Sequence, residues 1–321
     1  PAVRWRNFHN PSAGISFTAN TYAADVINAS ATKLYLNGVD VSSQLVLPAN
    51  GTTIAVSLPG AALQPNKVYG ARIELADTTG LKTSTNTFWF DTFSEAFLAS
   101  NPVKTIEAED YNYSNGVYQL DPVPVSGMDT NGALVNGSVD AGGNGLGFFG
   151  MTGTAGVDYA KPGGFYNLQL VEYRANDRVQ ITQGSYLSPS RDEAGDIQDF
   201  LTNLPPLRIN DTQRSRYAVS NVLEYQVRLT SPGDWMNYTR SFAPTNYHVY
   251  LRCGTFGSTT VYLDQVTTDP TVPRQERVRW GAFNVGNHIM RLNYQYEQLM
   301  YGSSPAVVQL AGTNTLRLTL G

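Results

Sequence analysis

The sequence predicts an all-β protein of two domains, because its length, composition and turn chemistry agree. Its 321 residues are roughly twice the usual length of a single domain. With 41% hydrophobic, 11% aromatic and only 15% charged residues, the chain does not belong to the disordered acidic class. The 29 Gly and 17 Pro residues separate short apolar stretches along the whole chain, which is typical of strands joined by turns.

Residues 1–93 are expected to form the first domain, a small β-sandwich. Its strands, inferred from alternating or β-branched stretches, are expected at residues 15–19, 33–36, 53–58, 68–75 and 83–90. Asn37-Gly38 and Pro59-Gly60 follow two of these stretches, and both pairs adopt turn conformations at little cost. Several short strands with a turn about every 8–12 residues are typical of such a sandwich.

Residues 94–104 interrupt this rhythm and are expected to form a linker, with a helical turn around residues 94–99. Residues 105–321 are expected to form the second domain. Its strands are expected at residues 105–109, 164–170, 222–229, 235–242, 247–253, 259–265, 288–294 and 315–320. Two long, polar, Gly-rich segments, 125–162 and 182–218, lie between them. Loops of this length usually serve a function or are ordered by an ion or ligand.

Charge and hydropathy exclude two classes of protein. Acidic residues outnumber basic ones 26 to 22, giving a net charge of −4, whereas a nucleic-acid binder needs a basic surface. No apolar run reaches about 18 residues, so the sequence predicts no membrane-spanning helix. No signal peptide is visible, and the start at Pro1 leads us to expect a processed or excised piece.

Few residues are suited to covalent or zinc chemistry. Cys253 is the single cysteine, which excludes an intrachain disulfide, and the three histidines are too scattered for a zinc site. The chain lacks the Gly-x-Ser-x-Gly and His-Glu-x-x-His motifs of common hydrolases. A glycoside hydrolase needs only two carboxylates, but those enzymes generally occupy larger folds. We therefore expect no enzymatic activity.

Two nearby glutamates, Glu107 and Glu109, predict a calcium site. In a strand over residues 105–109 they would share one face, because alternate residues point to the same side. Two carboxylates held together are unfavourable unless a cation lies between them, and Ca²⁺ prefers such oxygen ligands. On spacing alone, the alternative is a pair of solvated glutamates on an edge strand.

Four segments together resemble a known family. They are residues 106–111 (IEAEDY), 173–177 (YRAND), 233–240 (GDWMNYTR) and 247–252 (YHVYLR). Their order is similar to that in family 6-type carbohydrate-binding modules and the related families 35 and 36. The resemblance implies a β-jelly-roll sandwich with long loop inserts, in which Glu107 and Glu109 help bind a structural calcium ion. The Asp that closes this calcium site in the family has no counterpart in the last strand here.

The resemblance extends to the first domain and to a sugar-binding cleft. Residues 14–93 resemble the immunoglobulin-like or fibronectin-like modules of large bacterial surface proteins. Tyr173, Arg174 and Asp177 match a family motif near the binding cleft. The resemblance therefore implies that these three side chains contribute to ligand binding.

Aromatic and amide side chains supply further candidates, because a sugar ring packs on aromatic faces and its hydroxyl groups bond to polar side chains. Trp235 and Asn237 share a strand face that we expect to lie in the core, where Asn237 would need a buried partner. Asn237 is also a candidate ligand-binding residue. Trp280 follows a polar segment and is expected either as an exposed platform or as a packed side chain.

The leading hypothesis is non-catalytic polysaccharide binding by a calcium-stabilised β-sandwich module of an extracellular or cell-surface protein. The alternative is a structural subunit of a cell surface, adhesin or filament, assembled from copies of the chain. It rests on an expected free segment at residues 1–8 (PAVRWRNF), on the lack of an obvious aromatic platform, and on an expected incomplete sheet edge beside residues 315–320. Such an edge could accept a strand from another copy.

Overall fold

A computed structural model of the chain shows an all-β protein, as predicted. It describes residues 1–4, 9–21, 25–98, 100, 103–119, 148, 151–162, 174, 177, 179–184, 224–255, 257–286 and 295–321. The helical elements of this part are short, namely α1 (Glu95–Leu98) and the 3-10 turns η1 (Ala29–Ala31), η2 (Ser42–Gln44) and η3 (Gly60–Ala62). Among the described helices, none has the length and apolar character needed to cross a membrane.

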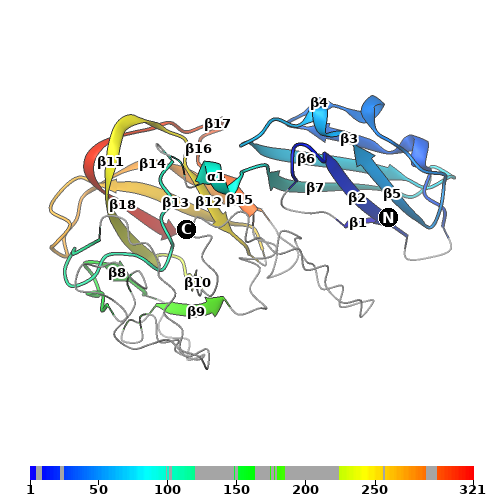
Figure 1. Cartoon of the computed structure of the whole chain (residues 1–321). Coiled ribbons are helices and arrows are strands. Elements are labelled where there is room, and N and C mark those ends of the chain that lie inside the picture. The colour runs from blue at the N-terminus through cyan, green and yellow to red at the C-terminus, as the bar shows by residue number, and fades with distance from the viewer. Residues whose placement is uncertain are drawn as a thin grey trace, which may run out of the picture.

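Two antiparallel sheets form the N-terminal domain (Figure 1). The first, in the order β1-β2-β5, consists of β1 (Ala2–Arg4), β2 (Ile15–Asn20) and β5 (Thr53–Leu58). The second, in the order β4-β3-β6-β7, consists of β3 (Lys33–Leu36), β4 (Val39–Asp40), β6 (Val68–Ala76) and β7 (Thr83–Asp91). All five strands predicted for residues 1–93 are present, and their bounds agree to within one residue.

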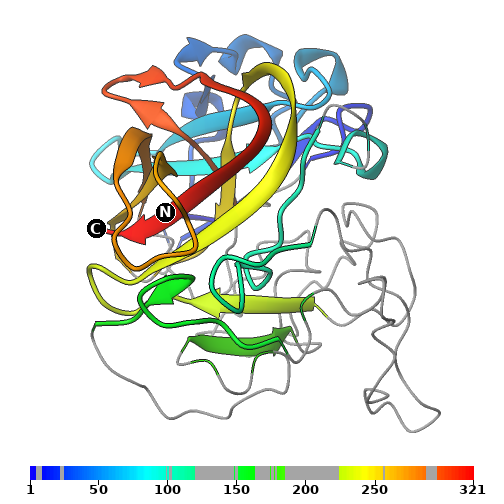
Figure 2. The same ribbon diagram turned by 90° about the vertical axis from the view of Figure 1, so that its left-hand side faces the viewer.

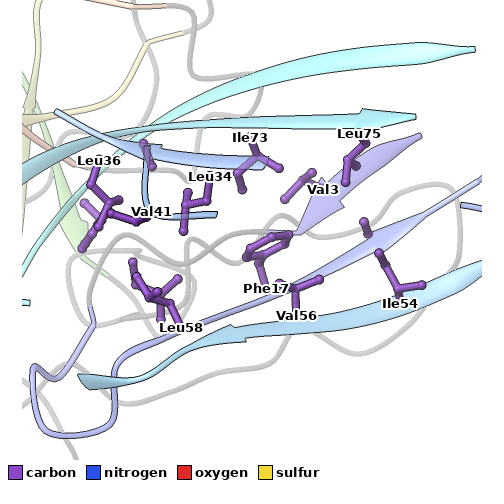
Figure 3. Packing of buried hydrophobic residues seen from close by; sticks show 14 of the residues in the cluster. Val3, Phe17, Leu34, Leu36, Val41, Ile54, Val56, Leu58, Ile73 and Leu75 are labelled. Carbon is purple, nitrogen blue, oxygen red and sulfur yellow. The ribbon is translucent and has the colours of Figure 1, made fainter. Parts of the chain in front are cut away.

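A hydrophobic core fills the space between these two sheets (Figure 3). Phe17 and Val56, paired on β2 and β5, lie on one side of it, and Leu34 and Ile73, paired on β3 and β6, lie on the other. Burial alternates along β2 and β5, as expected for strands with one face in a core. Each buried side chain of this kind stabilises the fold by roughly 1.5–3 kcal/mol.

The turn between β3 and β4 follows the chemistry of its two residues. Asn37 and Gly38 have positive φ angles of 48° and 82°, as the predicted Asn-Gly turn requires. Asn37 Oδ1 also accepts a hydrogen bond of 2.9 Å from the Gly70 N–H on β6. The turn residue thereby anchors the hairpin to the neighbouring strand.

A seven-stranded antiparallel sheet dominates the second domain, in the order β17-β16-β14-β13-β18-β11-β8. Its strands are β8 (Tyr159–Ala160), β11 (Trp235–Tyr247), β13 (Thr259–Val266), β14 (Arg277–Val285), β16 (Met300–Tyr301), β17 (Ser304–Pro305) and β18 (Val308–Leu320). The long strands β11 and β18 lie side by side and curl together, so the sheet has the form of a half-barrel (Figure 2).

Two small sheets cover the hydrophobic face of the seven-stranded sheet. One pairs β9 (Gln180–Gly184) with β10 (Glu224–Arg228), and the other pairs β12 (Tyr250–Cys253) with β15 (Gln295–Gln298). Leu251 and Cys253 pack against the cluster that contains Leu263. Ile181 lies in a second cluster with Tyr238. The second domain is therefore also layered, with its core between the large sheet and the two small ones.

Several strand predictions for the second domain need correction. Residues 105–109 do not form the expected strand; the Asp110 N–H donates to the Glu107 carbonyl at 3.1 Å and closes a turn over residues 108–109. Strand β14 was not predicted, because arginines and Gly281 obscure its pattern. The expected strands 164–170 and 288–294, and most of segments 125–162 and 182–218, lie outside the described residues.

Both ends of the chain take part in sheets; the strand at residues 315–320 was expected, whereas the pairing of the N-terminal residues and the inner position of the last strand were not. Residues Ala2–Arg4 pair with β2, and Val3 is buried in the first core. Strand β18 lies between β13 and β11, so residues 315–320 have a partner strand on each side. The free segment and the incomplete sheet edge, on which the structural-subunit alternative rested, are therefore not found at these residues.

Phe93, the last residue of the region expected as the first domain, contacts residues of the region expected as the second. Its side chain is buried, and its ring centre lies 5.5 Å from that of Tyr250 and 5.2 Å from that of Tyr296. Helix α1 follows within the predicted linker and confirms the expected helical turn. The first domain thus ends against the β12–β15 sheet of the second (Figure 1).

Candidate functional site

Polar and aromatic side chains gather on the side of the seven-stranded sheet that faces away from the hydrophobic clusters. Directly paired residues of an antiparallel sheet point to the same side, as do alternate residues of one strand. Two cross-strand rows arise in this way, Trp235–Thr319–Tyr262 and Asn237–Arg317–Asp264. We call these six residues, together with Arg277 and Arg279 of β14, the polar face.

A β-bulge turns the two arginines of β14 onto the polar face. The pairing of β13 with β14 shifts by one residue after Leu263, so that Asp264 lies opposite Arg279 and Trp280 is the extra residue. A shift of one residue exchanges the two sides of a strand. Arg279, and Arg277 two residues before it, therefore point to the same side as Asp264.

Two guanidinium groups stack on the aromatic rings of the polar face. Arg317 Cζ lies 3.5 Å from the ring centre of Trp235, and Arg279 Cζ lies 3.7 Å from that of Tyr262. A cation in this position gains roughly 0.5–2 kcal/mol, depending on how far it is desolvated. Arg317 is buried, whereas the Arg279 side chain is 48% exposed. Each stack holds a planar donor group in a defined position.

The charges of the polar face do not balance. The buried Asp264 accepts hydrogen bonds from Arg279 Nε at 2.8 Å and from an Arg277 terminal nitrogen at 3.1 Å. The bond to Asp264 raises the pKa of Arg279. Burial, together with the charge of Arg277, lowers the pKa of Arg317 to about 10, so Arg317 is still protonated at neutral pH. The polar face therefore has three guanidinium groups and one carboxylate.

Asn237, a predicted ligand-binding residue, lies fully buried at the base of the polar face. Its Nδ2 donates to the Val157 carbonyl and to Gln275 Oε1, each at 2.8 Å, and its Oδ1 accepts from Arg317 Nε at 2.8 Å. Asn237 thus has the buried partners that the sequence led us to expect. Its amide is committed to the protein and positions Arg317.

Arg174 and Asp177, also predicted to bind a ligand, lie in a buried network. Arg174 Nε donates to Asp177 Oδ2 at 2.9 Å, and its terminal nitrogens donate to the carbonyls of Tyr111 and Asn112 at 2.6 and 2.9 Å. The Asp177 carboxylate also accepts from the Tyr111 hydroxyl at 2.6 Å and from the Gly153 N–H at 2.7 Å. Burial raises the pKa of Tyr111. Both side chains are thus engaged in holding distant chain segments together.

Asn112 connects this buried network to the strands of the polar face. Its N–H donates to the Asn237 carbonyl at 2.8 Å, and its side-chain amide exchanges two hydrogen bonds with Thr239, of 2.7 and 2.8 Å. The Thr239 hydroxyl also bonds to that of Thr315 at 2.7 Å, across β11 and β18. Segments predicted from sequence as separate motifs, around residues 106–112, 174–177 and 233–240, therefore meet in space.

Trp235 lies in surroundings that differ from those expected, whereas Trp280 follows one of its two expected alternatives. Trp235 shares a strand face with Asn237, as expected, but this is the polar face, because Met236 and Tyr238 occupy the hydrophobic cluster instead. Trp280, the bulge residue, packs against the other hydrophobic cluster, and its Nε1 donates to Gln265 Oε1 at 3.2 Å. The packed alternative for Trp280 therefore describes its position. Tyr173 lies outside the described residues.

The predicted calcium ligands are placed differently from the prediction. Glu107 is half-buried and Glu109 is buried, and the turn at residues 108–109 removes the strand that was to align them. Burial, with the negative charge of Glu109, raises the pKa of the nearby Tyr238, whose hydroxyl donates to the Ala108 carbonyl at 2.8 Å. Across the described ranges, no three His, Cys, Asp or Glu side chains converge on a point where a metal could bind. Calcium binding at these two glutamates therefore stays a prediction of the resemblance.

Sequence analysis missed Tyr262, Asp264 and Arg317, although a signal was present. Residues 259–266 (TTVYLDQV) and 314–320 (NTLRLTL) each alternate between aliphatic residues and polar or aromatic ones. Such alternation predicts one side in the core and one side directed away from it. The presence of Arg, Asp and Tyr on the outward side of adjacent strands would have indicated the polar face.

The polar face combines ring surfaces with hydrogen-bond donors. Trp235 and Tyr262 are half-buried, and the side chains of Arg277 and Arg279 are 36% and 48% exposed. Guanidinium groups form paired hydrogen bonds with oxygen-rich molecules, and aromatic rings pack on the apolar parts of such molecules.

Comparisons with protein-family models and with curated proteins found no match for this chain.

Proposed function

We propose that the chain binds polysaccharides without catalysing a reaction, through the polar face of its second domain. The observation that carries this proposal is the pair of arginine–aromatic stacks, Arg317 on Trp235 and Arg279 on Tyr262. A sugar ring has apolar faces that pack on aromatic side chains and hydroxyl oxygens that accept hydrogen bonds from guanidinium groups. The polar face presents both kinds of group within adjacent strands.

The rigidity of the polar face also supports binding. Asn237 and Gln275 both accept hydrogen bonds from Arg317, and Gln275 Nε2 donates to the carbonyls of Pro270 and Val272 at 2.8 and 2.9 Å. A glycan that binds to side chains already fixed in this way orders few protein groups, which lowers the entropic cost of binding. The buried network around Arg174 would stabilise β11 as well, through the hydrogen bonds of Asn112 to Asn237 and Thr239.

We further propose that the two domains are an immunoglobulin-like or fibronectin-like module and a jelly-roll module of an extracellular or cell-surface protein. The division of the first domain into sheets of three and four antiparallel strands supports the former. The curled seven-stranded sheet, with two small sheets over its hydrophobic face, supports the latter.

Calcium binding at Glu107 and Glu109 stays a prediction of the resemblance. If the ion stabilises the loops around these residues, removing it with EGTA will lower the melting temperature, and added Ca²⁺ will restore it. A melting temperature that does not change with EGTA or Ca²⁺ would contradict the prediction. The same titration on a Glu109→Gln variant separates this site from any other.

Affinity electrophoresis and pull-down with polysaccharides test the proposed function. The panel contains cellulose, chitin, xylan, mannan and mixed-linkage β-glucan as well as acidic glycans. Tyr262→Ala removes a ring of the polar face and is expected to weaken binding roughly tenfold, the effect of losing about 1.4 kcal/mol. Tyr301→Ala is the control, because Tyr301 is 71% exposed on β16 and lies outside the polar face. Retention of no glycan by the unaltered protein would refute the proposal.

A further inference from the structure

An excess of positive charge on the polar face points to a particular class of ligand. Arg277, Arg279 and Arg317 surround one carboxylate, that of Asp264. Asp264 has already accepted hydrogen bonds from Arg277 and Arg279, which use three of their N–H nitrogens. Since the two side chains are 36% and 48% exposed, their other N–H groups can reach a bound molecule.

Glu276, the acidic residue next to Arg277 in the chain, does not cancel this excess. Glu276 precedes Arg277 by one residue, and its carbonyl continues the backbone ladder by accepting a bond from the Thr267 N–H at 2.9 Å. Alternation along β14 therefore directs Glu276 to the opposite side of the strand. The chain as a whole carries a net charge of −4, so the positive charge of the polar face is a local feature.

The buried guanidinium of Arg317 has a further reason to attract an anion. Burial removes the charge of Arg317 from water, and the positive charge of Arg277 repels it. Its hydrogen bonds go to the neutral side chains of Asn237 and Gln275, so Asp264, opposite it on β13, is the acid nearest to it in the sheet register. A negative group bound above Arg277 and Arg279 would offset this repulsion, whereas a neutral sugar would not.

We propose that the polar face selects polysaccharides whose sugar units carry an oxyanion, a carboxylate or a sulfate ester, held by the free N–H groups of Arg277 and Arg279. This inference rests on the proposed function and names the ligand class of the same site. Carboxylates and sulfates both match the planar fork of a guanidinium group, and charge-assisted bonds of this kind are roughly twice as strong as neutral ones.

Two matched pairs of polymers test the selectivity and distinguish the source of the oxyanion. Polygalacturonate is compared with its fully methyl-esterified form, which has the same backbone without the charge, and dextran sulfate is compared with dextran. Affinity electrophoresis at a fixed, physiological salt concentration measures each dissociation constant. We expect at least one charged polymer to bind about tenfold more tightly than its neutral partner, and the pair that shows this identifies the anion.

Variants locate the effect on the polar face. Arg277→Gln/Arg279→Gln should reduce the preference for the charged polymer to less than about threefold. It should also lower the melting temperature, because the buried Asp264 loses both of its cations, so circular dichroism at the assay temperature checks that the variant is folded. Lys33→Gln/Arg72→Gln is the matched control, since it removes two positive charges from the first domain, and it should keep the full preference.

Equal binding of charged and neutral polymers, or a preference that survives in Arg277→Gln/Arg279→Gln, would overturn the inference while polysaccharide binding itself stands. Binding to none of the four polymers would also overturn it, and the wider glycan panel then decides separately whether the proposed function fails.

Discussion

Arg317 donates a hydrogen bond of 2.8 Å from its Nε to the Oδ1 of Asn237, between two residues that lie directly opposite each other on β18 and β11. Both side chains are buried, although neither faces a hydrophobic cluster. A buried guanidinium and a buried amide are tolerated only when their polar atoms are paired. The pair therefore links the stability of the sheet to the geometry of the polar face.

Replacing Asn237 by alanine is expected to lower the free energy of unfolding by about 1–3 kcal/mol. The reason is that Arg317 Nε loses its acceptor and the Val157 carbonyl loses a donor in a buried setting. Urea denaturation followed by circular dichroism measures the change. Asn246→Ala, at an exposed position of the same strand, is the control and should change the stability by less than about 0.5 kcal/mol. Equal effects of the two substitutions would show that the buried pair adds nothing to stability.

Arg174→Met is expected to destabilise the protein more, by about 3–5 kcal/mol. The substitution leaves the carboxylate of Asp177 buried without its cation and removes the donors to two backbone carbonyls. Lys82→Met serves as the control, because the Lys82–Asp25 ion pair lies on the surface, and its loss should leave the unfolding midpoint almost unchanged. An unfolding midpoint for Arg174→Met close to that of Lys82→Met would contradict the structural role of the buried network.

The first domain could be predicted from sequence because its strands follow one simple rule. In β2, β5 and β6 the buried apolar side chains alternate with more exposed ones, and β3 and β5 are followed by turn-forming residue pairs, Asn37-Gly38 and Pro59-Gly60. Alternation and turn chemistry are both local properties of the chain. Local information is therefore sufficient to find these strands, whereas the order of the strands within the sheets depends on contacts between distant residues.

Arg277 and Arg279 could not be placed on the polar face from sequence, because their direction depends on one irregularity, the bulge at Trp280. If the pairing continued regularly past Leu263 without a bulge, Trp280 would lie opposite Asp264, and Arg279 would point to the core side of the sheet. The neighbouring Gly281 has a non-local role as well, since a Cβ atom there would lie 2.4 Å from the Met300 carbonyl oxygen of β16. Neither feature leaves a pattern that a single sequence displays.

The strand expected at residues 105–109, which was to align the two glutamates, is absent for a related reason. The segment 105–109 has the alternating composition of a strand, but the Glu107 carbonyl accepts a hydrogen bond from the N–H of Asp110, the next residue after the segment, and this bond closes a turn. Arg174 and Asp177 were identified as important residues, but their burial was not anticipated, since an arginine next to a long loop is usually exposed. Only the tertiary contacts with Tyr111 and Asn112 explain why this arginine lies inside.

The two tryptophans of the second domain should respond differently to a bound glycan. Trp235 lies on the polar face under Arg317, whereas Trp280 packs in the hydrophobic cluster on the other side of the sheet. We expect ligand binding to change the intrinsic fluorescence of the unaltered protein and of Trp280→Phe, and to leave that of Trp235→Phe nearly constant. A response that disappears in Trp280→Phe and persists in Trp235→Phe would place the ligand elsewhere.

Cys253 makes the stability of the protein depend on pH in the alkaline range. Its thiol packs against the hydrophobic cluster, and this burial, with the charge of Glu297 as a smaller cause, raises its pKa above the ordinary value of 9.0. In the unfolded chain the thiol ionises near its ordinary pKa, whereas in the folded protein it stays protonated to a higher pH. The contribution of the protonated thiol to stability is therefore complete below pH 9.0 and is lost as the pH rises above that value.

Urea denaturation of the unaltered protein and of Cys253→Ala at several pH values between about 7 and 10.5 measures this effect. The unfolding midpoint of the unaltered protein should fall more steeply above pH 9.0 than that of Cys253→Ala. The reason is that only the unaltered protein has a thiol whose ionisation stabilises the unfolded chain relative to the folded one. Alkylation by iodoacetamide gives an independent measurement, since the thiolate is the reactive form. At pH 8 the folded protein should react at least about tenfold more slowly than the urea-unfolded chain, and equal rates would show that the thiol is neither buried nor shifted in pKa.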